Sequence, residues 1–114
     1  MSGITTAAQA QLPGLKRTDL QHHDLSVPGH VVIQNLVEIS PEAQAIRHWH
    51  PGEEVIYVIA GALEYRIDGE EPRTYNAGEA LTVPAERVHS VHGNGTELAT
   101  YFVEKDKPFI VLAE

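Results

Sequence analysis

Apolar and polar residues alternate along most of this chain with the period of two that is typical of β-strands. Runs rich in β-branched and aromatic residues are separated by turn sequences such as "HPGEE", "DGEEP", "NAG" and "GNG". No window of helical length shows a 3.6-residue period. Short strands joined by such turns are typical of an antiparallel sandwich or barrel, so the sequence predicts an all-β fold. The predicted strands cover residues 30–39, 54–67, 79–85, 87–93 and 97–105.

The run "VIYVIAG" at residues 55–61 is apolar on both faces of its predicted strand. Because side chains alternate across a strand, Tyr57 is expected on the face opposite Glu54 and Ile56. One apolar face can line the interior, but the other needs a second layer or a partner subunit. A chain this short has few residues for a second layer, so we expect a homodimer.

Size and charge exclude several classes of function. With 114 residues the chain has the length of one domain. Its formal net charge of −8 repels phosphate backbones, so nucleic acid and anionic membranes are unfavourable partners. The absence of cysteine excludes disulfides, thiolate metal sites and a cysteine nucleophile. No apolar run approaches the roughly 20 residues that span a bilayer, which indicates a soluble protein.

The N-terminal stretch "MSGITTAAQAQLPG" lacks the basic and apolar regions of a secretion signal. We expect a flexible tail over residues 1–15 and a single domain over residues 16–114 in a cytoplasmic protein. The alternative is that "AQA" marks the remnant of a trimmed precursor, which would place the protein in the periplasm.

Four residues could form a metal site. His48 and His50 are expected to project from one face of a strand, while Arg47 and Trp49 project from the other. Pro51 and Gly52 turn the chain, so the carboxylate of Glu54 can return toward the imidazoles, and a later strand brings His89. An H-x-H pair alone is more often two surface or hydrogen-bonded histidines. Three imidazoles and one carboxylate together, however, suit a borderline divalent metal.

The full spacing supports the metal site. Residues His48 to Gly61 read H-x-H-x3-E-x6-G, and Gly78 to His89 read G-x5-P-x4-H, with 16 residues between the two strings. These strings resemble the two motifs of the cupin family. The resemblance implies a double-sheet β-barrel of the jelly-roll type, with the metal ligands His48, His50, Glu54 and His89. Two positions depart from the family pattern: Glu86 stands where glycine is usual, and Gly93 where asparagine is usual.

The chain looks most like small single-domain bacterial cupins of the quercetin-dioxygenase-like group. Four protein ligands leave coordination positions open for a substrate, so the resemblance implies a metal-dependent enzyme for a small chelating organic molecule. Oxygenation is the leading reaction, with Glu54 as a fixed ligand or as a base that swings off. The alternatives are an isomerase or lyase, and a non-catalytic binding module. Iron or manganese is favoured, and zinc, nickel or cobalt is possible.

Other polar residues receive simpler interpretations. His92 lies three residues beyond His89, so it is expected to face away from the site. Tyr65 and Tyr101 could offer a hydroxyl to a substrate, although burial with a backbone partner is the default. Residues 16–29 are expected to pair with the sheet of another protomer.

Overall fold

The computed structural model describes residues 13–113 and contains only β-strands as regular structure in that range. No helix among these residues could cross a membrane. The predicted all-β class is therefore confirmed. The strands are β1 (Leu15–Asp24), β2 (His30–Ile39), β3 (His48–Trp49), β4 (Glu54–Ile67), β5 (Arg73–Asn76), β6 (Ala80–Val83), β7 (His89–Glu104) and β8 (Val111–Leu112).

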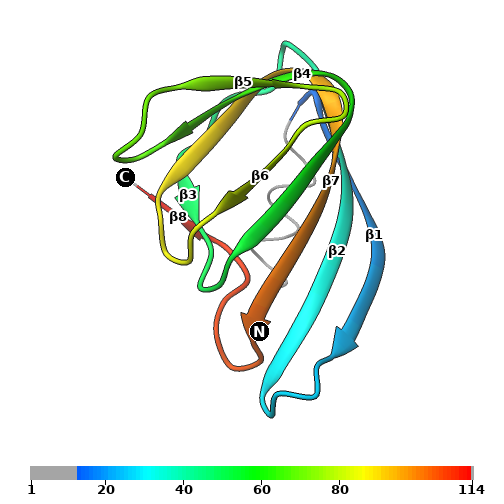
Figure 1. The fold of residues 1–114 in the computed structure, drawn as a ribbon, viewed down its shortest axis with the longest axis vertical. Helices are drawn as coiled ribbons and strands as arrows, with labels where there is room; N and C mark the ends of the chain where they lie inside the picture. Colours follow the sequence, from blue (N-terminus) through cyan, green and yellow to red (C-terminus); the bar gives the residue numbers. More distant parts are fainter. Residues whose placement is uncertain (1–12, 114) are drawn as a thin grey trace.

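The two longest strands are β4 and β7. The whole of β4 pairs antiparallel with β7, and this pair connects the two halves of the fold. The first half of β4 and the second half of β7 lie between β6 on one side and β2 with β1 on the other. Their other halves lie between β5 and the short strands β3 and β8. All strands are antiparallel, and the sheet curls around an interior (Figure 1).

Both long strands bend at glycines that face each other, because Gly61 pairs with Gly95 in the β4–β7 register. Gly61 has a φ of 75°, and a Cβ there would lie 2.1 Å from the carbonyl oxygen of Asn94. At Gly93 a Cβ would lie 2.5 Å from the carbonyl oxygen of Ala62. The turn predicted at "GNG" is therefore wrong: the glycines let β7 continue through the bend, and the two predicted strands are one.

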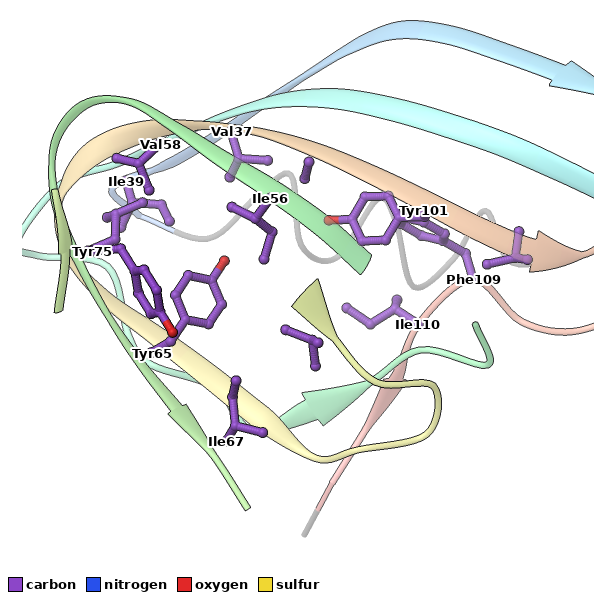
Figure 2. Packing of buried hydrophobic residues seen from close by; sticks show 14 of the residues in the cluster. Val37, Ile39, Ile56, Val58, Tyr65, Ile67, Tyr75, Tyr101, Phe109 and Ile110 are labelled. Atoms are coloured by element: carbon purple, nitrogen blue, oxygen red, sulfur yellow. The ribbon is translucent and has the colours of Figure 1, made fainter. Parts of the chain in front are cut away.

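A β-bulge in β4 keeps its buried face toward the interior on both sides of this bend. Ile56 and Val58 are buried before the register shift, whereas Leu63, Tyr65 and Ile67 are buried after it. The buried positions thus change from even to odd numbers across the bulge. Figure 2 shows the resulting core, in which the rings of Tyr65 and Tyr101 reach into the interior.

The N-terminal strand lies at the edge of its own sheet. A turn closed by the bond from Leu25 N to His30 O folds β1 onto β2, and the pairing of residues 16–29 with another protomer stays a prediction. The segment thus becomes an edge of its own sheet, with Arg17 opposite Val37. The predicted flexible tail lies, over residues 1–12, outside the part of the chain that the structure describes.

Candidate metal centre

The structure brings the four predicted residues together from three strands. His48 in β3 pairs with His89 at the start of β7, His50 follows β3 directly, and Glu54 begins β4. One nitrogen from each imidazole lies within 4.8 Å of the other two. The Glu54 Oε1 atom is 3.3 Å from His50 Nε2 and 3.2 Å from His89 Nε2. We call the three histidines the imidazole cluster.

Each imidazole of the cluster is held by a backbone carbonyl. The Nδ1 atoms of His48, His50 and His89 lie 2.8, 3.0 and 2.9 Å from the carbonyl oxygens of Ile46, Phe109 and Arg87. A carbonyl can only accept, so each Nδ1 is the protonated donor. In a neutral ring the lone pair then lies on Nε2, which for His50 and His89 faces Glu54. Metal-binding histidines are commonly oriented in this way.

Acceptor atoms converge in this cluster and need a cation between them. His50 Nε2 is buried and makes no hydrogen bond, although Glu54 Oε1 lies close to it. Burial, followed by the neighbouring His89 and His50, lowers the pKa of His48 to about 3, so this ring is neutral at physiological pH. The donor set therefore fits a divalent ion, and a proton on a ring nitrogen is its competitor.

Glu54 is ionised in this setting. Burial by itself would raise its pKa, but the neighbouring rings of His50 and His89 outweigh burial and hold that pKa well below its usual range. The carboxylate thus keeps its negative charge among the imidazoles whether a proton or a metal ion balances it.

A second set of polar side chains was not predicted as a unit. Tyr65 donates a hydrogen bond to Glu97 Oε1 at 2.6 Å, and Arg17 donates one to the Tyr101 hydroxyl at 3.1 Å. We call these four residues the acid–guanidinium group. The two tyrosines are buried as expected, but the predicted backbone partners are wrong, because side chains fill that role.

Glu97 is a functional candidate that was not predicted from the sequence. It is 2% exposed and lies in β7 on the face that also buries Ala99 and Tyr101. Burial, together with the charge of Glu54, raises its pKa to about 8, even though Tyr65 and Arg17 act in the opposite direction. The sequence did contain one signal for it, because Glu97 is an acidic residue on the otherwise apolar face of an alternating strand.

His48 and His89 of the imidazole cluster, together with the acid–guanidinium group, line one cavity of about 50 Å³. Its remaining lining is mostly apolar, with Leu15 and Val37 among the contributors. Such a volume suits a few water molecules or a ligand of a few heavy atoms. The polar lining includes Arg17, His48, Glu54, Tyr65, His89, Glu97 and Tyr101.

The positions that were expected outside the site lie outside it. His92 is exposed on β7, as its spacing predicted, and Tyr57 is 48% exposed on the outer face of β4. Glu86 has a φ of 65°. The backbone here thus has the left-handed conformation that favours glycine, although the residue is a glutamate. Its amide donates to the carbonyl of His50 at 2.8 Å, which connects this loop to the cluster.

Comparisons with known proteins place these observations in a family. A lyase for dimethylsulfoniopropionate, DddQ of Ruegeria pomeroyi, is 31% identical over 65 residues, which is 57% of this chain. The chain matches only 27% of the length of that relative. KdgF from Halomonas sp. superposes with a TM-score of 0.64 at 23% identity, covering 82% of this chain and 83% of that one.

An oxalate oxidase in complex with glycolate superposes with a TM-score of 0.66 at 25% identity, covering 90% of this chain and 57% of that one. The family model described as "Cupin domain" matches residues 35–104, which is more than half of the chain and includes the whole imidazole cluster. With the curled double-sheet fold and the three converging histidines, the chain belongs to the cupin family.

Proposed function

We propose that this cupin is a metal-dependent enzyme that acts on a small, metal-chelating organic molecule. His48, His50, His89 and Glu54 would hold the ion. One observation carries the proposal: three Nδ1–H groups are fixed on backbone carbonyls, which leaves imidazole lone pairs and one carboxylate converging on the same point. Nitrogen and oxygen donors without sulfur favour iron or manganese, with zinc, nickel or cobalt as alternatives.

A bound divalent ion would supply Lewis acidity and open coordination positions. The residues of the chain would do the rest. The imidazoles keep their orientation because carbonyl oxygens hold their Nδ1–H groups. Glu54 stays ionised, as a fixed ligand or as a base that swings off. The apolar lining of the cavity limits water around the substrate.

Oxygenation is the first candidate reaction, in line with the resemblance to quercetin-dioxygenase-like cupins. A second candidate is a lyase or isomerase reaction, and Glu97 is the observation that favours it. Its carboxyl group lies in the same cavity as the imidazole cluster, and a pKa of about 8 suits proton transfer near neutral pH. The curated relative whose name describes a lyase supports this candidate.

The test combines metal analysis with two activity assays. Protein purified without an affinity tag and without added metal is analysed for metal content. Oxygen consumption is then followed on a panel of diketones, flavonols and small hydroxy acids, and elimination products are measured in parallel. Iron or manganese near one ion per chain with turnover of either kind supports the enzyme. Zinc with ligand binding but no turnover supports a binding module instead.

We also propose that the protein is a homodimer through the outer face of β4. Val55, Tyr57 and Ile59 on this face are 40, 48 and 46% exposed, and Phe102 on β7 is 38% exposed. Apolar side chains gathered on one sheet face are typical of a surface that another protein covers. Light scattering at micromolar concentration is expected to give twice the chain mass. Tyr57→Ser is expected to shift the protein toward a monomer, whereas a wild-type monomer would contradict the proposal.

A further inference from the structure

Arg17 is the cationic side chain that lines the cavity alongside the imidazole cluster. It comes from β1, which lies outside the residues matched by the family model. Its neighbour Lys16 is exposed, whereas Arg17 points inward and its Nε atom is fully buried. A guanidinium inside a protein is costly, because it gives up its hydration.

Several contacts fix this guanidinium in place. Nη1 donates to the hydroxyl of Tyr101 at 3.1 Å, and the ring of Phe109 lies 6.0 Å from Cζ. The buried amide of Asn35, in the orientation that satisfies both of its ends, accepts from Nη1 at 3.0 Å. The ring of Tyr101 in turn lies 4.7 Å from the ring of His50, so the guanidinium is two contacts away from the cluster.

The charges of the cavity do not balance once a divalent ion is bound. Arg17 is positive and Glu54 is negative, so these two cancel, while the neutral imidazoles add nothing. A divalent ion therefore leaves excess positive charge in a small, largely buried space. This excess persists even if Glu97 ionises. Because an uncompensated charge is strongly unfavourable in such surroundings, the cavity favours an anionic occupant.

We propose that Arg17 is the specificity residue of the cavity and that the substrate is a small carboxylic acid, whose carboxylate Arg17 binds. A guanidinium matches a carboxylate in shape and charge, and charge-assisted hydrogen bonds are the strong ones. The cavity of about 50 Å³ limits such an acid to a few heavy atoms. This inference rests on the proposed metal-dependent function, which it narrows to one substrate class.

The first experiment needs no variant. Wild-type protein carrying manganese is titrated calorimetrically with glycolate and with glycolamide. Both molecules offer a hydroxyl and a carbonyl oxygen to a metal, but only glycolate carries a charge. Glycolate is expected to bind at least roughly tenfold more tightly, since a hydrogen bond to a charged group contributes about 1.5–3 kcal/mol. Equal affinity would overturn the inference.

The second experiment tests the residue. Arg17→Met is expected to weaken glycolate binding by roughly tenfold or more and to leave manganese content unchanged. Arg17→Lys keeps the charge without the planar fork and is expected to lie between Arg17→Met and wild type. Lys16→Met removes the same charge from the neighbouring exposed position and should bind glycolate as the wild type does. If Arg17→Met does not fold, Arg17→Lys carries the comparison.

Metal content measured in the same samples separates the two proposals. Wild-type protein that takes up no manganese, iron or zinc would overturn the metal-dependent function and this inference with it. Full metal content with wild-type glycolate affinity in the Arg17 variants would overturn only the assignment of Arg17. Loss of affinity in Lys16→Met as large as that in Arg17→Met would also count against it, because the effect would then be a general one of surface charge.

Discussion

The imidazole cluster and the acid–guanidinium group both contribute side chains to one cavity but are held in different ways. In the cluster, each ring is oriented by a backbone carbonyl that lies near it in space, within two residues along the chain for His48 and His89. In the acid–guanidinium group, Tyr65 holds Glu97 and Tyr101 holds Arg17, so side chains orient one another. We infer from this difference that the cluster suits the cation proposed above, while the second group suits the proposed proton transfer and anion binding.

The largest effect is expected from substitutions within the imidazole cluster. His89→Ala or His50→Ala removes one of the converging donors. The affinity for the metal should fall by more than the roughly 10–100-fold that losing a supporting partner costs, so metal content should fall strongly. Elemental analysis of purified protein measures this loss. His92→Ala is the matched control on the same strand and should keep wild-type metal content, because its side chain is exposed. Equal loss in both would show that the assigned ligand set is wrong.

The second prediction concerns the pH at which a metal can stabilise the protein. Added manganese at about 100 times its Kd contributes about 2.7 kcal/mol, or about 10 °C in melting temperature for a chain of this size. Protons compete with the ion for the ring nitrogens of the cluster as pH falls, so this increment should be larger at pH 7.5 than at pH 5.

Calorimetric melting of metal-loaded and metal-free protein at each pH provides the measurement. The metal-free protein is needed because His48 affects stability by itself. Its folded pKa of about 3 lies below that of an unfolded histidine, so the unfolded state binds more protons between about pH 3 and 6.5. The contribution of His48 to the stability of the metal-free protein is therefore lost as pH is lowered through that window. A difference between the two forms that stayed flat from pH 7.5 to 5 would exclude a histidine-based site.

A third prediction addresses the acid–guanidinium group alone. The folded pKa of Glu97, about 8, lies above that of an unfolded glutamate, so the folded state binds more protons between about pH 4.5 and 8. This contribution to stability is present at low pH and is lost as pH rises, with a slope of at most about 1.4 kcal/mol per pH unit. Glu97→Gln should remove that slope. Its free energy of unfolding relative to the wild type should therefore rise toward pH 8.

Urea unfolding of metal-free wild type and Glu97→Gln at pH 5.5, 6.5 and 7.5 measures the slope. Glutamine keeps a side-chain oxygen that can accept the hydrogen bond from Tyr65, so the contact survives the change. Glu38→Gln, at an exposed position of β2, serves as the control and should leave the slope as it is in the wild type. A wild-type slope in Glu97→Gln would mean that Glu97 is already ionised in the folded state.

The smallest effect is expected in the loop beside the cluster. Glu86 has a φ of 65°, which costs a residue with a side chain about 1–2 kcal/mol, whereas glycine adopts this conformation freely. Glu86→Gly also makes the unfolded chain more flexible, which offsets part of the gain. We therefore expect at most about 1 kcal/mol of added stability, measured by urea unfolding. Glu79→Gly, at a position without a positive φ, should destabilise instead.

The sequence by itself determined the strand pattern and the imidazole cluster. The strands at residues 30–39 and 54–67 have the predicted bounds, because the alternation of apolar and polar positions directly reflects which face of a strand is buried. His48, His50 and Glu54 lie close along the chain, so strand geometry and one turn suffice to bring them together. The motif spacing added His89, and the structure places it opposite His48.

Only the tertiary structure decided the bend of β7, the pairing of β1 and the acid–guanidinium group. The "GNG" glycines serve in a turn or in a bent strand equally well, and the facing bend in β4 selects the second. Arg17 and Glu97 are 80 residues apart in the sequence, and no local pattern relates them. The folding of β1 onto β2 and of β2 onto β7 brings both to one cavity, where burial and the charge of Glu54 then raise the pKa of Glu97. Such effects depend on the surroundings of a side chain, which the fold alone supplies.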